Sequence, residues 1–451
     1  MSTIAAIATP YGLGGVAMIR LSGDDAISIA ADSFLTRSGR SLNEYSGYQA
    51  AYGDIIGCDG MKIDDGIALI FRAPHSYTGE DVVEITCHGG VAVSELVLRC
   101  FLDRGALLAG RGEFTKRAFL NGKMDLTAAE GVIKLIESES EASVRLAAQG
   151  KDGKLQQKIR ELSETMISIA ANIQVFLDYP EEEIPETELK NVQMELLSQR
   201  SKMRRLLQQY RQNRIVREGA KIVFVGEPNV GKSTLINQLC GEDKSIVTDI
   251  PGTTRDAIEV KTRFHGILTT LIDTAGLRYT EDPIEKIGVE KAKNMMADAD
   301  VVIFVLDSSR SIEKQLQLFR QQETQKPTIL VVNKIDLNRI TLDENEFERV
   351  VYTSQKMEET IDWLRDEIAQ TLKITEIDPN ISGLLNERQY SAILRSEKEI
   401  SEVITDLEMG VPLDLVSISL EEGIDVLLEL TGERASEEII DQIFSKFCVG
   451  K

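Results

Sequence analysis

The chain has 451 residues, enough for two or three domains, and its 42% hydrophobic and 27% charged residues are ordinary for a globular protein. A formal net charge of −22 argues against a protein that coats nucleic acid non-specifically. The five cysteines form no C-x-x-C pair, and no apolar run reaches transmembrane length. We therefore expect reduced thiols and a cytoplasmic protein.

Residues 1–118 mix strand-like and helical patterns, which predicts an α+β domain. The strand-like runs are residues 3–10, 15–23, 64–74 and 81–90, and residues 91–106 have apolar side chains at helical spacing. His75 and His88 lie beside expected strand ends, but too few further ligands lie nearby for a metal site. We expect both histidines to be packed or hydrogen-bonded side chains.

Residues 119–216 and 377–451 have helical periodicity, which predicts an all-α domain in two pieces. One seam alternates spacings of four and three and is formed by Leu155, Ile159, Leu162, Met166, Ile169, Ile173 and Phe176. A later helix has an apolar face and a basic face, the latter formed by Lys202, Arg204, Arg205, Arg211, Arg214 and Arg217. We interpret the basic face as solvated, with RNA phosphate contact as a weaker alternative.

Residues 221–233, KIVFVGEPNVGKS, combine a buried strand with the pattern G-x-x-x-x-G-K-S. The glycines allow successive N–H groups to converge at the start of a helix, which makes a phosphate site. In that site Lys232 would reach the β- and γ-phosphates, and the Ser233 hydroxyl would bind Mg²⁺. The octapeptide alone also fits an ordinary strand–turn–helix connection.

Two further motifs follow apolar runs, as a guanine-nucleotide switch requires. Asp273-Thr274-Ala275-Gly276 follows LTTLI, so that Asp273 can hold the Mg²⁺ water shell and the Gly276 N–H can sense a γ-phosphate. Asn333-Lys334-Ile335-Asp336 follows TILVV, and the Asp336 carboxylate can pair with guanine N1–H and its 2-amino group. Three motifs in this order predict GTP binding.

The position after D-T-A-G holds Leu277, where Ras-type switches have a Gln that orients water. Catalytic help must therefore come from another group. Asn229 in the phosphate loop offers a side-chain carbonyl that could ligate a monovalent cation and so stabilise transition-state charge. The plainer interpretation of Asn229 is a loop residue that caps a turn.

The predicted fold is therefore multidomain. An α+β N-terminal domain spans residues 1–118, an all-α helical domain spans 119–216 and 377–451, and an α/β Ras-like P-loop GTPase domain spans 217–376. We expect the GTPase domain to be an insertion in the helical domain, because the ends of a domain often lie close together.

Over its whole length the chain resembles the tRNA-modification GTPases of the MnmE or TrmE type. The resemblance is carried by STIAAIATP, RLSG, SYTGEDVVEITCHGG, GEFTKRAFLNGKMDL, GEPNVGKS, TDIPGTTRD, DTAGLR, NKID and the terminal FCVGK. Members of this family work with a flavin-dependent partner of the MnmG or GidA type, which carries FAD. Together they add an aminomethyl or carboxymethylaminomethyl group to C5 of the wobble uridine, position 34, of certain tRNAs.

The resemblance also implies cofactors and assembly. The N-terminal domain would bind a 5-formyl- or methylene-tetrahydrofolate and form a homodimer, with a heterotetramer formed with the partner. K⁺ and GTP would bring two G domains together, and hydrolysis would drive conformational change. By motif, the GTP site would comprise Asn229, Val230, Gly231, Lys232, Ser233, Thr234, Thr248, Asp249, Ile250, Pro251, Gly252, Thr253, Thr254, Asp273, Thr274, Ala275, Gly276, Asn333, Lys334, Asp336 and Ser354.

Individual roles also follow from the resemblance. Asn229 and the carbonyls of Thr248, Ile250 and Thr253 would hold K⁺, and Thr254 would join Ser233 on Mg²⁺. Glu285 would be the catalytic glutamate, although by itself it reads as a solvated residue at a helix start. The folate contacts would be Arg20, Glu84, Lys123 and Lys451.

Cys448 matches the family's terminal cysteine, whose catalytic part is suspected. One position departs from the family: Gln355 follows Ser354, where a small residue usually contacts the guanine. The alternative function is a regulatory GTPase that assists ribosome assembly. That alternative explains the nucleotide motifs but not the segments at the two ends of the chain.

Overall fold

The computed structural model describes residues 2–178, 186–241, 258–274, 293–321, 324–342, 346–374 and 383–451. The chain divides into two compact units. Unit 1 comprises Met1–Ile136, Ala148–Leu207 and Leu384–Lys451, and unit 2 comprises Glu137–Ala147 and Gln208–Gly383. In the described ranges, no helix combines the length and the apolar character that a membrane crossing requires.

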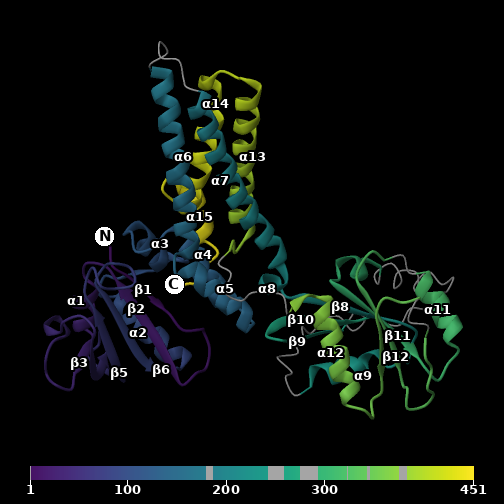
Figure 1. Cartoon of the computed structure of the whole chain (residues 1–451). Coiled ribbons are helices and arrows are strands. Elements are labelled where there is room, and N and C mark those ends of the chain that lie inside the picture. The colour runs from purple at the N-terminus through teal and green to yellow at the C-terminus, as the bar shows by residue number, and fades with distance from the viewer. Residues whose placement is uncertain are drawn as a thin grey trace, which may run out of the picture. The chain divides into compact units, whose positions relative to one another are not determined.

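Unit 1 contains a seven-stranded sheet in the order β3-β4-β5-β6-β2-β1-β7 (Figure 1). The strands are β1 (Ile4–Ile7), β2 (Val16–Ser22), β3 (Phe34–Thr36), β4 (Gln49–Ile56), β5 (Lys62–Phe71), β6 (Val82–His88) and β7 (Leu107–Leu108). Its neighbouring pairs are antiparallel apart from β1 with β7. The four strand-like runs expected near β1, β2, β5 and β6 are therefore present, whereas β3 and β4 were not predicted.

One face of this sheet is buried because apolar side chains alternate along its strands. Ile19 and Leu21 on β2 and Ile85 on β6 are fully buried in one core with Ile27 and Phe101. Ile27 belongs to α1 (Ala26–Ala31), and Phe101 belongs to α2 (Val91–Leu102). The helices that cover the sheet thus supply large apolar side chains to its core.

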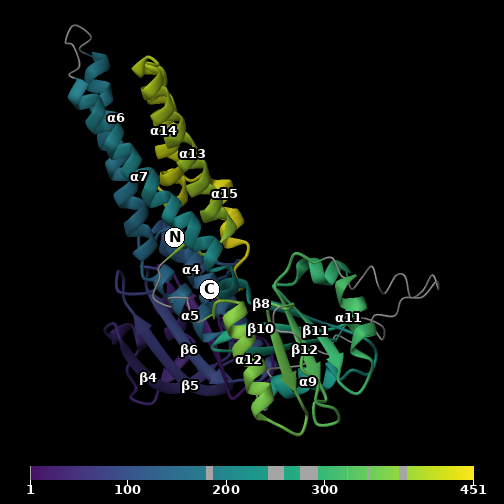
Figure 2. The ribbon, with the colours of Figure 1, turned by 45° about the vertical axis from the view of Figure 1, so that its right-hand side comes forward.

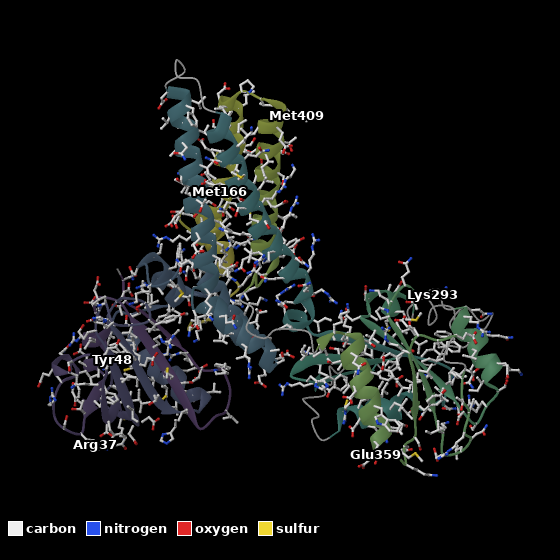
Figure 3. The ribbon with its side chains drawn as sticks, viewed as in Figure 1. Arg37, Tyr48, Met166, Lys293, Glu359 and Met409 are labelled. Atoms are coloured by element: carbon white, nitrogen blue, oxygen red, sulfur yellow. The ribbon has the colours of Figure 1, made fainter. Side chains whose placement is uncertain are left out.

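The second part of unit 1 is helical, and four of its helices are long. Its helices include α3 (Glu113–Leu120), α4 (Leu126–Glu137), α6 (Lys154–Asp178), α7 (Glu186–Gln212), α13 (Glu387–Met409), α14 (Leu413–Thr431) and α15 (Glu437–Phe444). Figures 1 and 2 show α6, α7, α13 and α14 running alongside one another. The first six residues of the predicted seam on α6 are buried, including Met166, which Figure 3 labels within these helices. Phe176, the seventh, is half-buried.

The expected basic face of 202–217 is wrong at Arg217. Its side chain is only 7% exposed, and its guanidinium carbon lies 3.6 Å from the centroid of the Tyr210 ring. Arg217 belongs to the short helix α8 (Arg214–Glu218), where Gly219 ends the turn and the chain enters a strand. A guanidinium stacks well on an aromatic face, so this cation is a packing element of unit 2 rather than a solvated charge.

Unit 2 is built on a six-stranded sheet in the order β13-β12-β11-β8-β10-β9. The strands are β8 (Ala220–Val225), β9 (Ile258–Phe264), β10 (Ile267–Asp273), β11 (Val301–Asp307), β12 (Thr328–Asn333) and β13 (Val350–Thr353). All neighbouring pairs are parallel except β9 with β10. This is the mainly parallel α/β sheet that the sequence predicts.

Helices accompany this sheet as the buried strands require. They are α9 (Lys232–Cys240), α11 (Ile312–Arg320) and α12 (Glu359–Thr371), whereas α5 (Glu141–Lys151) is divided between the two units. Ile312 and Leu316 of α11 pack with Val223 and Val225 of β8 in one core. Because side chains alternate along a strand, Ile222 and Phe224 of β8 face the opposite side, and both are fully buried. The sheet is therefore covered on both faces, and ligands are confined to its ends.

Candidate functional site

The sequence motifs of unit 2 meet at one edge of its sheet. The phosphate loop follows β8, Asp273 ends β10, Asn333 ends β12, and Ser354 follows β13. These four strands run parallel to one another in the sheet, so their carboxyl ends share that edge. A crevice outside the carboxyl ends of parallel strands is the usual ligand site of this architecture.

Two glycines of the phosphate loop are required by its backbone. Gly226 has φ +148° and Gly231 has φ +100°, a range that side chains disfavour. A Cβ at Gly226 would lie 2.5 Å from the Val305 carbonyl oxygen, and one at Gly231 would lie 2.4 Å from Asn333 Nδ2. The loop is therefore packed between β11 and the β12 end with no space for a side chain.

Lys232 begins helix α9 and its ammonium lies inside the loop. Lys232 Nζ donates to the carbonyl oxygens of Gly226 at 3.1 Å and Glu227 at 3.0 Å. The side chain is buried, and that burial lowers the pKa of Lys232. An anion beside this ammonium would stabilise its charged form, as a phosphate site demands.

Ser233 and Asp273 are hydrogen-bonded to each other. Ser233 Oγ donates to Asp273 Oδ2 at 2.5 Å, which places a hydroxyl and a carboxylate together at the start of α9. Oxygen ligands of this kind suit Mg²⁺. Thr274, also predicted in this site, is buried and donates its hydroxyl to the Phe224 carbonyl at 2.7 Å, so it fastens β10 to β8.

Asn333 and Lys334 fasten the phosphate loop to the end of β12. Asn333 Nδ2 donates to the Val230 carbonyl at 2.9 Å, and Lys334 Nζ donates to the Asn229 carbonyl at 2.8 Å. Asn333 also accepts from Thr353 Oγ1 at 3.1 Å. The structure thus brings both residues of this motif together with the loop that the sequence assigned to phosphate.

Two residues of this edge were missed by the sequence analysis. Asp307 ends β11, is 1% exposed, and lies 2.6 Å from Lys334 Nζ. Arg310 Nη1 donates to the Pro228 carbonyl at 3.1 Å and to Glu227 Oε2 at 3.3 Å, while its Nε lies 3.5 Å from Asp307 Oδ2. Asp307 could have been noticed in the sequence, because it comes directly after the buried strand run 301–306.

The guanine-selecting carboxylate predicted at Asp336 is held from two sides. Ser354 Oγ donates to Asp336 Oδ1 at 2.8 Å, and Lys356 Nζ lies 2.9 Å from Oδ2. These hydrogen bonds, that of Lys356 first, lower the pKa of Asp336, so the carboxylate is ionised. Gln355 departs from the family pattern, and its backbone carbonyl accepts a hydrogen bond from Gln238 Nε2 at 3.3 Å.

Several predicted residues lie outside the described ranges. They are Thr248, Asp249, Ile250, Pro251, Gly252, Thr253, Thr254, Ala275, Gly276 and Glu285, together with Leu277. Val230 is buried in the phosphate loop, and Thr234 is half-buried in the first turn of α9.

A second cluster lies in unit 1, where the last residues of the chain reach the sheet. Arg20 and Glu84 are cross-strand neighbours on β2 and β6, with Arg20 Nε donating to Glu84 Oε1 at 2.8 Å. Arg20 Nη1 donates to the Gly450 carbonyl at 3.0 Å. Gly450 has φ +92°, and a Cβ there would lie 2.5 Å from the Ile7 carbonyl. A carboxylate and a cation thus lie side by side, both partly buried, under the chain terminus.

The other predicted folate contacts differ in their surroundings. Lys451 is partly buried, and its pKa is lowered by that burial and by the nearby charge of Arg20. Lys123 instead donates to the Pro74 carbonyl at 3.0 Å. Cys448 is exposed, and its carbonyl accepts a hydrogen bond from the Gly112 N–H at 3.4 Å. The structure therefore joins Arg20, Glu84 and the chain end, and gives Lys123 a separate contact.

Fold and site together define a P-loop GTPase joined to a mixed sheet domain and a helical domain. The family model described as the MnmE helical domain matches residues 126–448, and the model described as the GTP-binding protein TrmE N-terminus matches residues 3–123. A protein named tRNA modification GTPase MnmE from Carboxydothermus hydrogenoformans is 41% identical, covering 100% of this chain and 99% of its own. A protein of the same name from Clostridioides difficile is 38% identical, and the match again covers 100% of this chain and 99% of that protein.

The chain therefore belongs to the MnmE family of tRNA modification GTPases. Among solved structures, the G domain of the T. maritima FeoB iron transporter is 32% identical over 34% of this chain and 98% of that one. Its TM-score of 0.28 is too low to support a further comparison.

Proposed function

We propose that this chain is a K⁺-stimulated GTPase that acts with a flavin-dependent partner on tRNA. The pair would add an aminomethyl or carboxymethylaminomethyl group to C5 of the wobble uridine, position 34. One observation carries the proposal: the nucleotide-binding motifs at one edge of the unit 2 sheet and a partly buried Arg20–Glu84 pair in unit 1 occur in one chain. The MnmE relatives match that chain end to end.

GTP binding is supported by the donors at the sheet edge. Lys232 and the N-terminal amides of α9 suit the phosphates, since the first N–H groups of a helix have no partner within it. The Asp336 carboxylate suits the N1–H and 2-amino group of guanine. Ser233 and Thr254 are the proposed Mg²⁺ ligands. The hydrogen bond between Ser233 and Asp273 supports this choice, because it places two oxygen groups together.

K⁺ stimulation rests on Asn229. Its side chain is exposed at the loop, and its backbone carbonyl is already engaged by Lys334. The side-chain carbonyl can therefore serve a cation, with the carbonyls of Thr248, Ile250 and Thr253 as further ligands. A cation there would supply positive charge where the transition state builds negative charge. Leu277 occupies the position where Ras-type switches have a water-orienting Gln, so Glu285 is the residue proposed to orient the attacking water.

A reduced folate is the proposed one-carbon cofactor of unit 1. Arg20 and Lys451 are cations suited to a carboxylate tail, and the Glu84 carboxylate is suited to the donor edge of a pterin ring. The residues present thus fit a 5-formyl- or methylene-tetrahydrofolate. Lys123 is proposed as an outer contact, and the exposed Cys448 as a catalytic thiol.

The assembly follows from the same proposal. Residues 1–118 form the folate-binding and dimerisation domain, 119–216 with 377–451 the helical domain, and 217–376 the GTPase domain. Hydrolysis drives G-domain dimerisation and conformational change in a homodimer that joins the flavoprotein as a heterotetramer. A tRNA substrate and five cysteines without a disulfide favour the cytoplasm.

The test is nucleoside mass spectrometry of total tRNA from a strain that lacks this gene, with and without the restored gene. Loss and recovery of C5-aminomethyl-type wobble uridines are expected. Unchanged wobble uridines would overturn the proposal. If the deletion strain then accumulated immature ribosomal subunits, the ribosome-assembly function would replace it.

A further inference from the structure

Two cysteine sulfurs of unit 1 accept hydrogen bonds from the same guanidinium nitrogen. Cys58 is in the turn that follows β4, and Cys100 is in the last turns of α2. Arg104 Nη1 donates to Cys58 Sγ at 2.9 Å and to Cys100 Sγ at 2.7 Å. Because both distances are measured from the same nitrogen, the two sulfurs can be at most 5.6 Å apart, the sum of 2.9 Å and 2.7 Å.

The two thiols differ in their access to solvent. Cys58 is exposed, whereas Cys100 is 3% exposed and donates its S–H to the Ile56 carbonyl at 3.1 Å. Burial raises the pKa of Cys100, and the Arg104 charge opposes that change. A guanidinium beside a thiol stabilises the thiolate, which is the reactive form. The pair thus has an accessible sulfur that meets an oxidant first and a sheltered sulfur that can react second.

Two other cysteines, Cys87 and Cys448, differ from this pair in their surroundings. Burial and, to a lesser extent, the nearby Asp64 charge raise the pKa of Cys87 to about 11, so its thiol is inert at neutral pH. Cys448 is exposed, and no cation is recorded beside its sulfur in the described residues. These two thiols are internal references for the reactivity of the Cys58–Cys100 pair.

We propose that Cys58 and Cys100 are a redox-active dithiol that a hydroperoxide converts into an intramolecular disulfide. The Cys58 thiolate attacks the hydroperoxide, the O–O bond breaks, a hydroxyl stays on the Cys58 sulfur as sulfenic acid, and the leaving alkoxide or hydroxide takes up the proton that the Cys58 thiol released. The Cys100 thiolate then attacks the Cys58 sulfur, the S–S bond forms, the S–O bond breaks, and the leaving hydroxide becomes water with the proton that the Cys100 thiol released. The two thiols lose two electrons, and the hydroperoxide gains them.

Arg104 has a defined part in this sequence. Its guanidinium remains protonated and holds both sulfurs within reach while each is a thiolate. The disulfide would join the β4–β5 turn to the end of α2, because those elements carry the two sulfurs. The unfolded chain would then be constrained by a loop between residues 58 and 100, so the oxidised protein should melt at a higher temperature.

The test treats the full-length protein with one equivalent of hydrogen peroxide, blocks free thiols and digests without reductant. Trypsin releases Cys100 in the five-residue peptide 100–104 and Cys58 in peptide 41–62. Their covalent pair, two hydrogens lighter than the sum of both, is the expected product. A thiol reductant should remove it and reverse the rise in melting temperature.

Three variants separate the proposal from incidental oxidation. Cys100→Ser should trap sulfenic acid on Cys58, detectable with a sulfenic-acid-specific dione probe, and Cys58→Ser should leave Cys100 unmodified. Arg104→Gln should slow formation of the linked peptide about tenfold, because it removes the charge that favours thiolates. If the peroxide modifies Cys448 as fast as Cys58, or if oxidised Cys58 fails to join Cys100, the proposal is overturned.

Discussion

Lys334 Nζ lies 2.6 Å from the Oδ2 atom of the buried Asp307, and the same ammonium donates to the Asn229 carbonyl. Three segments therefore meet through one side chain: the end of β11, the turn after β12 and the phosphate loop. Lys334 has φ +64° and Asn229 has φ +64°, so both hold backbone conformations that cost free energy. The Asp307 carboxylate holds Lys334 in place and, through it, the backbone at Asn229.

Asp307→Asn should destabilise unit 2 and weaken GTP binding. The amide cannot neutralise Lys334, and breaking a buried ion pair costs about 3–5 kcal/mol. Because Lys334 is 31% exposed, water would recover part of that loss, so we expect about 2 kcal/mol. Urea unfolding measures the stability and a fluorescent GTP analogue measures the affinity. Equal stability in the variant and the parent would contradict the role assigned to Asp307.

The same pair predicts a pH dependence. Burial by itself would raise the pKa of Asp307, but hydrogen bonds from Lys334 and Ser309 outweigh it and lower the pKa below its usual value. A lowered folded-state pKa gives stability that is present above the unfolded value, about 3.9, and is lost as the pH falls through the folded value. The difference in free energy of unfolding between the parent and Asp307→Asn should therefore shrink below about pH 4. A constant difference down to pH 2.5 would show that Asp307 contributes no charge.

Asn229→Gly should remove the preference for K⁺ over Na⁺ in GTP turnover while sparing GTP affinity. Glycine keeps the positive φ and the backbone carbonyl that Lys334 contacts, so the change removes only the side chain with its amide group. Asn229→Ala is the matched control for strain, since its Cβ at this φ costs about 1 kcal/mol. Turnover rates in KCl and NaCl give the ratio. A ratio that survives in Asn229→Gly would remove the side chain from the cation site.

Arg310→Gln should raise KM for GTP several-fold and leave kcat nearly unchanged. Arg310 contacts the phosphate loop at the Pro228 carbonyl and the Glu227 carboxylate, so its loss loosens the loop before any reaction. Arg310→Lys should restore little, because a single ammonium cannot make the forked contacts of a guanidinium.

A double-mutant cycle with Glu227→Gln separates the two contacts of Arg310. If the Pro228 carbonyl is the main one, the effects of the two substitutions should add. A fall in kcat with an unchanged KM would instead show that Arg310 acts in the chemical step.

Local sequence motifs made much of the candidate nucleotide site, at the carboxyl ends of the unit 2 strands, predictable. Gly226–Ser233 follows β8, and Asp273 and Asn333 are the last residues of β10 and β12. Because parallel strands bring their carboxyl ends together, these motifs could be expected at one edge of the sheet. Asp307 and Arg310 could not be found in this way. A polar residue after a strand is most often solvated, and only the packed structure shows that Lys334 turns back onto Asp307.

Long-range contacts were harder to predict. Arg20 contacts the Gly450 carbonyl across 430 residues, which no periodicity encodes, and only the family resemblance suggested that the chain end is near. β4 was missed because Gly53 and Asp54 interrupt its apolar pattern. Arg217 was assigned to a solvated face because charge alone does not show that Tyr210 lies beneath it.

Asp336→Asn should shift nucleotide preference from GTP towards xanthosine triphosphate. In the proposed site the carboxylate would accept from guanine N1–H and the 2-amino group, whereas an amide can donate to the extra oxygen of xanthine. Ser354 and Lys356 hold the carboxylate, one on each oxygen. Competition binding with the two nucleotides measures the change. A variant that keeps its preference for GTP would refute the assignment.

Lys356→Ala is the control for that experiment. Its side chain is 73% exposed, and an exposed ion pair contributes about 0–1 kcal/mol. Selectivity for guanine should therefore persist in Lys356→Ala, with at most a small change in affinity. Ser354→Ala removes a bond that orients Asp336 and should weaken GTP binding more than Lys356→Ala does, again without favouring xanthine. If Lys356→Ala alone relaxed selectivity, the ammonium rather than the carboxylate would be the group that reads the base.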